Sequence, residues 1–245
     1  MKLGSIKENL DQEKRIAITP DIIRKYKSLG LDIVLPKNYG IHLGISDDEF
    51  KNQGAEITDT SNKVLEQVDA VLQMNLISEE NSKKLKNNQY LIGVLNPFLN
   101  NERIQKLIEK KIKCFSLELL PRITRAQSMD ILSSQANLAG YKAVVESFAH
   151  FEKAIPMMMT AAGTVPAAKV LVVGAGVAGL QAIATAKRMG AIVFATDVRM
   201  ASKEQVESLG GKFLTVEGSE NMETEGGYAK ETSDDFKKKT RGIVI

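Results

Sequence analysis

The stretch Lys169-Val-Leu-Val-Val-Gly174-Ala-Gly176-Val-Ala-Gly179 decides the fold of this 245-residue chain. It begins with an almost continuous apolar run, which is typical of a strand buried on both faces of a parallel sheet. The pattern G-x-G-x-x-G follows at once, and an alanine-rich segment then leads to Gly190. The sequence therefore predicts a strand over 169–174, a helix over 176–190 and a second strand over 191–197.

This strand–glycine–helix unit predicts a dinucleotide-binding turn. The glycines allow a tight turn, close approach of the backbone to a pyrophosphate and tight helix–strand packing, and the helix N-terminus offers N–H groups to the phosphates. Asp197 ends the next strand 21 residues after Gly176, where a carboxylate accepts hydrogen bonds from the adenosine ribose. That acid favours NAD over NADP, whereas Arg199 nearby opposes this preference. The predicted cofactor-binding residues here are Gly174, Ala175, Gly176, Val177, Ala178, Gly179, Asp197, Val198 and Arg199.

The rest of the chain divides around a long helix. Strands and helices alternate over residues 3–119, which predicts a mostly parallel sheet covered on both faces. A helix over about 127–151, with one broad buried face, follows, and an apolar loop then leads to Lys169. The predicted fold is α/β, with two Rossmann-like doubly wound parallel-sheet domains joined by a long helix. The predicted regions are an N-terminal domain (1–126), a connecting helix (127–153) and a dinucleotide-binding domain (154–245), of which only the first half is present.

Composition excludes several other classes of protein. The net charge is +3 and no basic cluster is interleaved with aromatic residues, so we expect no nucleic-acid partner. A single cysteine, Cys114, rules out a disulfide framework, and His42 and His150 lack metal-ligand spacing. The apolar stretch over 154–186 is broken by prolines and glycines, so we expect no membrane span. The first residues carry too many charges for a signal peptide, which favours a cytoplasmic protein.

A second segment, Pro121 to Gln135, is unusually rich in polar side chains. It has two interpretations: a functional loop, or a solvated helix entry in which Gln127 and Asp130 support the first turn. Composition does not decide between them. The polar residues of this segment are Arg122, Arg125, Gln127, Asp130, Ser133, Ser134 and Gln135.

Several quoted segments resemble one family. These are ELLPRITRAQSMDILSSQANLAGYKAV (118–144), PMMMTAAGTVPAAKVLVVGAGVAGLQAIATAKRMGA (156–191), ATDVR (195–199), KEQVESLGGKF (203–213) and GGYAKE (226–231). They are similar to the NAD(H)-binding N-terminal region of alpha subunits in the proton-translocating NAD(P) transhydrogenases, within the alanine dehydrogenase/transhydrogenase family. The resemblance implies hydride exchange between NAD(H) on this chain and NADP(H) on a beta component. It also implies a homodimer, and a separate membrane component that carries protons and holds this chain at the inner membrane from the cytoplasmic side.

The resemblance also assigns roles to individual residues. Arg122 and Gln127 would orient the nicotinamide carboxamide and ring, Asp130 would hold Arg122 or the ring, and Ser133 belongs to the same loop. The GGYAKE segment, with Gly227 and Tyr228, matches a loop that closes over NAD(H). Direct transfer between two nicotinamides needs no acid or base, so catalysis would rest on proximity and orientation.

Two alternatives stay open at this point. An alanine dehydrogenase would use Arg15 for its substrate, but it needs a lysine and a histidine where this chain has Gln73 and the segment GVLNPF (93–98). The second alternative is an inactive truncated remnant. Only one half of a dinucleotide domain lies between residues 170 and 216, and the last residues, GIVI, would open the second half. On this interpretation we expect NAD(H) binding to survive, hydride transfer by this chain alone to fail, and the sheet to present an uncovered edge.

Overall fold

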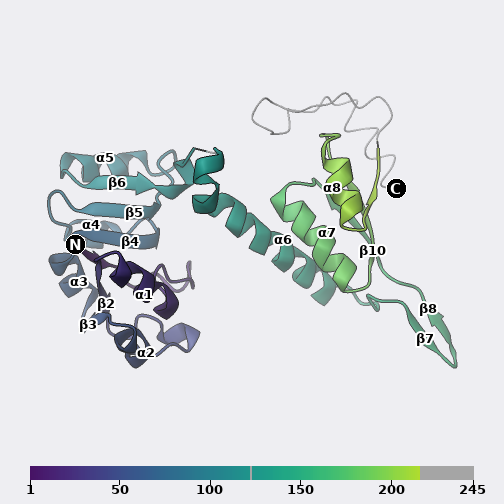
Figure 1. The fold of residues 1–245 in the computed structure, drawn as a ribbon, viewed down its shortest axis with the longest axis horizontal. Helices are drawn as coiled ribbons and strands as arrows, with labels where there is room; N and C mark the ends of the chain where they lie inside the picture. The colour runs from purple at the N-terminus through teal and green to yellow at the C-terminus, as the bar shows by residue number, and fades with distance from the viewer. Residues whose placement is uncertain (122, 216–245) are drawn as a thin grey trace. The chain divides into compact units, whose positions relative to one another are not determined.

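The structure is a computed structural model, and it describes residues 1–121 and 123–215. The chain forms two compact units, Met1–Asp130 and Ile131–Ile245 (Figure 1). No helix within the described ranges is long and apolar enough to cross a membrane. The predicted closing loop with Gly227 and Tyr228, the helix near residue 236 and the strand over 242–245 lie outside the described residues.

The first unit is a six-stranded, all-parallel sheet. Its strand order is β3-β2-β1-β4-β5-β6, which is the doubly wound order with the switch point between β1 and β4. Leu3 of β1 pairs with Ile33 on one side and Ala70 on the other. The strands are β1 (Lys2–Gly4), β2 (Asp32–Pro36), β3 (Glu56–Thr58), β4 (Ala70–Asn75), β5 (Tyr90–Val94) and β6 (Lys113–Ser116).

Helices link these strands, and local capping explains where several of them begin. Pro20 occupies the first turn of α1, and Ser46 and Glu49 form a capping box at α2. The hydroxyls of Thr60 and Ser78 accept N–H bonds at the starts of α3 and α4. The helices of this unit are α1 (Pro20–Ser28), α2 (Asp47–Asn52), α3 (Ser61–Gln67), α4 (Glu79–Ser82) and α5 (Asn101–Glu109), with the short 3-10 helices η1 (Ile41–Leu43), η2 (Leu117–Leu119) and η3 (Thr124–Met129).

Two apolar clusters bury the two faces of this sheet. Ile33 and Leu35 belong to one cluster, and Val34 between them belongs to the other. Successive side chains of a strand point to opposite faces, so the clusters lie on opposite sides of the sheet. This arrangement confirms the predicted parallel sheet covered on both faces.

The second unit carries a smaller parallel sheet in the order β11-β10-β9. This is the order of one half of a doubly wound sheet, as the sequence predicts. Its core packs alanines and branched residues such as Ile183, Val193 and Val206 between helices and sheet. The elements are α6 (Ile131–Ala149), β7 (Met158–Thr160), β8 (Gly163–Val165), β9 (Lys169–Val173), α7 (Val177–Arg188), β10 (Ile192–Thr196), α8 (Ser202–Ser208) and β11 (Lys212–Phe213).

Helix α6 differs from the predicted helix. It begins at Ile131 because residues 124–129 form the 3-10 helix η3 instead. The expectation of one broad buried face is wrong, since only Gly140 and Val144 are buried and Leu138 is largely exposed. Gly140 explains this narrow contact: a Cβ there would lie 2.0 Å from the Ala178 carbonyl oxygen of α7. The two helices therefore meet backbone to backbone at one point.

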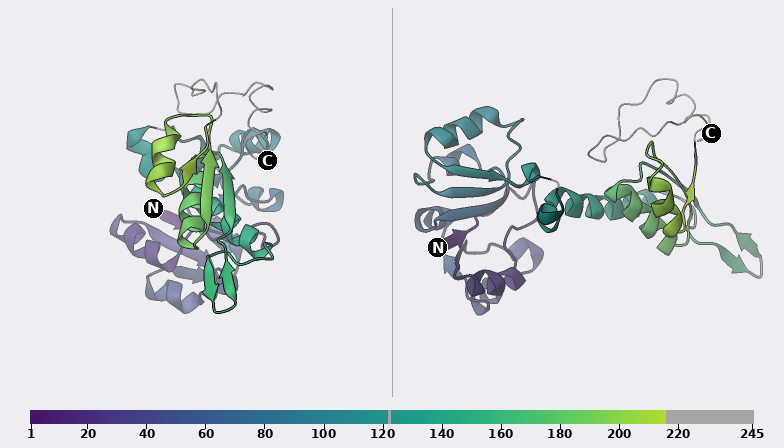
Figure 2. Two further views of the ribbon diagram at one scale, coloured as in Figure 1. Left: turned by 90° about the vertical axis from the view of Figure 1, so that its right-hand side faces the viewer. Right: turned by 45° about the horizontal axis from the view of Figure 1, so that its top comes forward.

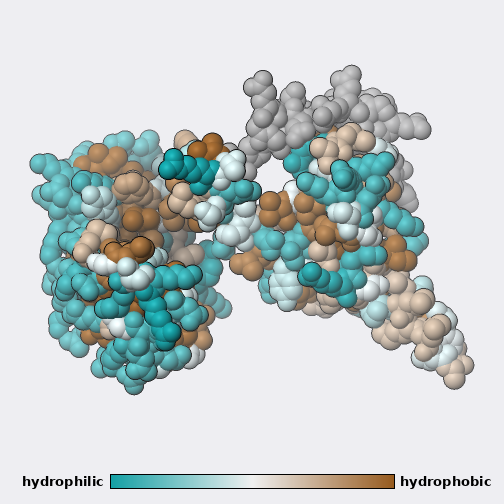
Figure 3. All heavy atoms as spheres, viewed as in Figure 1, coloured by the Kyte–Doolittle hydropathy of each residue, from teal (hydrophilic) through white to brown (hydrophobic). Residues whose placement is uncertain are grey.

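Residues 158–165 form an antiparallel hairpin where the sequence predicted an apolar loop. Met158 of β7 pairs with Val165 of β8, and Thr160 pairs with Gly163 (Figure 2). The hairpin extends away from the three-stranded sheet, and its side chains Met158, Met159 and Val165 are exposed. Figure 3 shows weakly hydrophobic residues along this arm rather than the hydrophilic residues common elsewhere on the surface.

Candidate functional site

The glycine turn of the second unit connects β9 to α7. Gly174 has a φ of +95°, a conformation that side chains disfavour, and its N–H donates to the Thr196 carbonyl oxygen at 2.8 Å. A Cβ on Gly179 would lie 1.8 Å from the Gly174 carbonyl oxygen, so only glycine lets α7 pack against this turn. Two of the three glycines thus have a steric cause inside the protein itself.

The third glycine, Gly176, has a different environment. A Cβ at this position would meet nothing within 4 Å, and the residue is exposed. Gly176 is also the N-cap residue of α7, whose first-turn N–H groups have no partners within the helix. The space in front of Gly176 is therefore open to an anion, and the helix dipole favours negative charge there.

Asp197 lies beside this turn, at the end of β10. Its side chain is only 5% exposed, and Oδ2 accepts a hydrogen bond of 2.6 Å from the Ala175 N–H. Arg199 surrounds the same carboxylate: its backbone N–H and Nε donate to Oδ1 at 2.8 and 2.9 Å, and its NH2 group donates to Oδ2 at 3.0 Å. The predicted acid and glycine turn are thus brought together, and Arg199 is bound to the acid.

This pairing sets the charge of the site. Burial raises the pKa of Asp197, but the hydrogen bonds from Arg199 and Ala175 outweigh burial, so the pKa is lowered overall. Asp197 therefore stays ionised at neutral pH. The Arg199 guanidinium neutralises this carboxylate, so an added 2′-phosphate would find it already paired.

The polar segment before α6 lies partly within the described residues. Gln127 is exposed in η3, Asp130 follows it with an extended backbone, and Ser133 sits in the first turn of α6. Arg122 lies outside the described residues. Asp130 and Ser133 each have an interaction partner. The orientation of these side chains toward a nicotinamide stays a prediction.

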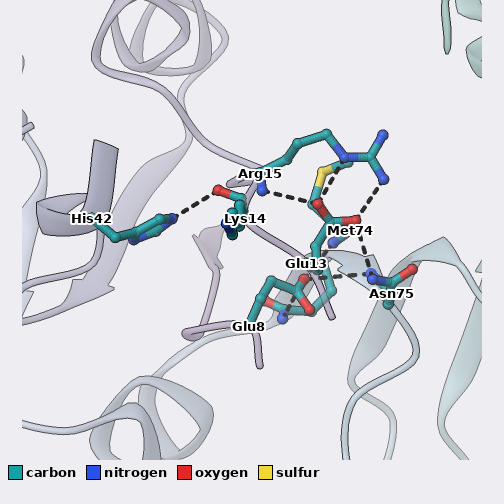
Figure 4. A network of polar contacts seen from close by, with 8 residues as sticks. Glu8, Glu13, Lys14, Arg15, His42, Met74 and Asn75 are labelled. Atoms are coloured by element: carbon teal, nitrogen blue, oxygen red, sulfur yellow. Dashed lines mark hydrogen bonds and ion pairs between the residues drawn. The ribbon is translucent and has the colours of Figure 1, made fainter. Parts of the chain in front are cut away.

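A second polar site, which the sequence did not predict, lies at the switch point of the first unit. The chain between β1 and α1 folds over the end of β4 and places two carboxylates there (Figure 4). Glu8 Oε1 accepts hydrogen bonds from the Gln73 side chain and the Met74 N–H. Glu13 binds the Arg15 guanidinium through both oxygens and accepts a bond from the Asn75 side chain.

The two carboxylates have opposite pKa shifts. Hydrogen bonds from Arg15 hold the pKa of Glu13 at about 2. Burial raises the pKa of Glu8, and the N–H bonds of Met74 and Asn75 only partly offset it. The only sequence signal was the long connection after β1, because the partners of these acids lie more than 60 residues away in the chain.

The residues that stand where an alanine dehydrogenase carries its lysine and histidine have structural roles here. Gln73 is buried and its oxygen accepts bonds from the Ser5 hydroxyl and the Ile6 N–H. The Asn96 N–H donates to the carboxylate of Glu118. Neither side chain titrates near neutral pH, so neither supplies the protonation step of amino-acid oxidation.

An apolar pocket of about 430 Å³ lies along β9 within the second unit. Phe148 and Phe151 of α6 form one wall, and Val170 and Val172 of β9 form another. In the part of the chain that the structure describes, β9 is the edge strand of its sheet, and Val173 is 72% exposed. This is the uncovered edge that the sequence leads us to expect.

Comparison with known proteins places this fold in a family. The family descriptions "Alanine dehydrogenase/PNT, N-terminal domain" and "Alanine dehydrogenase/PNT, C-terminal domain" match residues 4–139 and 143–241. The chain belongs to the alanine dehydrogenase/PNT family. Together the two matches span almost the whole chain.

Within this family the chain is closely similar to transhydrogenase alpha subunits. It is 49% identical to an NAD(P) transhydrogenase subunit alpha of Rhodospirillum rubrum, over 100% of this chain and 66% of that relative. A solved transhydrogenase from Sinorhizobium meliloti superposes with a TM-score of 0.84 at 46% identity, over 88% of this chain and 64% of that one. The chain thus spans slightly less than two thirds of the length of these relatives.

Alanine dehydrogenases are more distant relatives. That of Methanococcus maripaludis is 26% identical over 88% of this chain and 58% of that enzyme. Together with the roles of Gln73 and Asn96, this lower similarity favours a transhydrogenase component over an amino-acid dehydrogenase.

Proposed function

We propose that this chain is the NAD(H)-binding component of a proton-translocating transhydrogenase. In this role it passes hydride between its own NAD(H) and NADP(H) held by a beta component. The observation that carries the proposal is the glycine turn: Gly174 and Gly179 are required by the protein's own backbone, whereas Gly176 faces open space beside Asp197. The similarity to transhydrogenase alpha subunits supports the same function.

The chain's own residues would bind and orient the cofactor. The first-turn N–H groups of α7 would bind the pyrophosphate, and Asp197 would accept the adenosine ribose hydroxyls. Because the bonds from Ala175 and Arg199 already use both Asp197 oxygens, the ribose would have to displace some of them. The NAD(H) supplies the hydride, and Arg122, Gln127, Asp130 and Ser133 would orient its nicotinamide.

The predicted partners belong to this proposal as well. A membrane component would translocate protons and hold the chain at the cytoplasmic side of the inner membrane. The homodimer is supported by the β7–β8 hairpin, because an isolated two-stranded hairpin is marginally stable and this one exposes Met158, Met159 and Val165. Sedimentation equilibrium of the chain and of Met159→Lys tests the dimer: the substitution should shift a dimer toward monomer, and an unchanged mass would exclude this contact.

The enzymatic proposal is tested by reconstitution. The chain is mixed with NADP(H)-binding and membrane components from a relative, and reduction of a thionicotinamide or acetylpyridine analogue of NAD⁺ by NADPH is measured. We expect turnover that requires this chain and is lost in Gln127→Ala, with Ser128→Ala as a control at an adjacent exposed position. Binding of NADH without turnover would favour the inactive remnant, and alanine-dependent NADH production would favour the dehydrogenase.

A further inference from the structure

The first unit contains a basic pocket that the proposed function does not use. It has a volume of about 150 Å³ and lies between α4 and α5. Its apolar floor is made by Leu76, Ile77 and Leu107. Four cationic side chains and a single acidic one, Glu79, complete the lining; the cations are Lys83, Arg103, Lys106 and Lys110.

Two of these cations are held in place without being neutralised. Arg103 donates to the Ile77 carbonyl oxygen, and Lys110 donates to the carbonyl oxygens of Ser82 and Lys83. Carbonyl groups carry no net charge, so both cations keep their full charge inside the pocket. In the parts of the chain that the structure describes, no ion pair joins any of the four pocket cations to a carboxylate, whereas nearby Lys84 is paired with Glu80.

The sequence concentrates positive charge around this pocket. Residues 76–113 contain eight basic and four acidic residues, a net charge of +4, while the whole chain carries +3. Two similar runs, KKLK (83–86) and KKIK (110–113), produce most of this excess. The parallel pairing of β5 with β6 brings the two runs together, and the Asn88 N–H donates to the Lys111 carbonyl oxygen.

Helix periodicity aligns the remaining charges. Arg103, Lys106 and Lys110 follow one another at spacings of three and four residues, so they share one face of α5 and its C-terminal extension. Like charges on one helix face repel each other unless an anion lies between them. A concave, partly apolar surface also strengthens the field of these cations because less water screens them.

From this arrangement we propose that the pocket binds a phosphate-bearing anion. A phosphate offers several strongly accepting oxygens, which matches cations that approach from two different elements. Arg103 and Lys110 would provide the fixed donors. Lys83 and Lys106 would close on the anion, their aliphatic stems packing on the apolar floor. A free phosphate compound and a phospholipid headgroup share this chemistry.

The test is calorimetric titration of the full chain with inorganic pyrophosphate at low ionic strength. The variant Lys83→Gln/Lys106→Gln is compared with Lys25→Gln/Lys37→Gln, which removes the same charge from exposed lysines elsewhere in the same unit. We expect the pocket variant to weaken binding at least tenfold and the control to change it less than twofold. Gly176→Ala should leave this binding step unchanged, which separates it from the dinucleotide turn.

A second arm identifies the source of the phosphate. Co-sedimentation with phosphatidylglycerol vesicles that is lost only in the pocket variant would assign the site to a lipid headgroup, and pyrophosphate binding without vesicle binding would assign it to a free phosphate compound. Equal affinity of pocket variant and control, or no saturable binding of either probe, would overturn the proposal. Binding of polyglutamate peptide in place of pyrophosphate would overturn it as well.

Discussion

The two units place the end of their first strand at equivalent points of a doubly wound sheet, and they use that point in opposite ways. In the second unit β9 passes directly into α7 through Gly174-Ala175-Gly176, which leaves open space and N–H donors. In the first unit β1 ends at Gly4 and α1 begins only at Pro20. The chain between them fills the equivalent space with its own carboxylates, Glu8 and Glu13.

This difference shows which feature determines a binding site on such a fold. The parallel topology fixes where a site can form, namely beyond the carboxyl ends of the strands at the switch point. The length and chemistry of the connection after the first strand then decide whether the place is open and suited to anions or filled and acidic. Substitutions at the two switch points test this contrast, beginning with the largest expected effect.

Gly179→Ala should unfold the second unit. Its Cβ would lie 1.8 Å from the Gly174 carbonyl oxygen, and the backbone of a packed turn cannot move away cheaply. We expect a loss of more than about 4 kcal/mol in the free energy of unfolding of that unit. Hydrogen exchange resolved by residue should show loss of protection over 169–213 and normal protection in the first unit. A melting temperature equal to that of the unchanged chain would contradict the turn geometry.

Glu13→Gln should destabilise the first unit by about 2 kcal/mol at neutral pH, because it removes the charged partner of Arg15. The pKa of Glu13 is lowered to about 2, so its contribution is fully present above pH 4.5 and is lost as the pH falls through about 2. Urea denaturation between pH 7 and pH 3 checks this: the gap between the two proteins should narrow as the pH falls. A gap independent of pH would show that the ion pair contributes little.

Gly176→Ala should leave the fold intact and weaken NADH binding. The Cβ would meet nothing in the protein, and the φ of −75° at this residue is open to alanine. The methyl group would project into the space proposed for the pyrophosphate, so we expect at least about a tenfold loss of affinity, or roughly 1.4 kcal/mol. Fluorescence titration with NADH, beside a thermal melt, measures both quantities. Unchanged affinity would place the cofactor elsewhere.

Asp197→Asn should weaken NADH binding about tenfold and reduce the preference for NADH over NADPH, because the negative charge beside the ribose disappears. The lowered pKa of Asp197 also predicts a flat NADH affinity from pH 8 to pH 5, since the carboxylate stays ionised throughout. Dissociation constants for both nucleotides across this pH range provide the check. Asp21→Asn, at an exposed position in the first unit, is the control.

Glu8→Gln should have the smallest effect, within about 0.5 kcal/mol of no change at neutral pH. The glutamine oxygen can accept the same bond from the Met74 N–H without the penalty of a partly buried charge. Because burial raises the pKa of Glu8, its favourable contribution is complete below pH 4.5 and declines as the pH rises through the folded-state pKa. A strong destabilisation by this variant would show that the charge itself holds the loop.

The sequence predicted the regions of the molecule whose causes are local. Gly174, Gly176 and Gly179 lie within six residues of one another, and the apolar runs on either side determine strand and helix. The parallel order of the sheets followed from strand–helix alternation. The proximity of Asp197 to the turn followed from the length of one strand–helix–strand unit.

The features that the sequence missed depend on distant partners. Glu8 and Glu13 look like members of a solvated charged run, and only the folded sheet brings Met74 and Asn75 against them. The exposed side of α6 was misjudged because Gly140 limits its contact with α7 to one point. The β7–β8 hairpin was missed because an apolar segment with prolines at both ends carries no alternation of polar and apolar residues.

The contrast between the two switch points is tested most directly by the stoichiometry of NADH binding. Isothermal titration of the chain should give one NADH per chain, and this heat should vanish or weaken at least tenfold in Gly176→Ala while the melting temperature stays unchanged. Glu13→Gln, which alters the other switch point, should leave the stoichiometry and affinity unchanged. Two NADH molecules per chain, or binding that is sensitive to Glu13→Gln and insensitive to Gly176→Ala, would contradict the account.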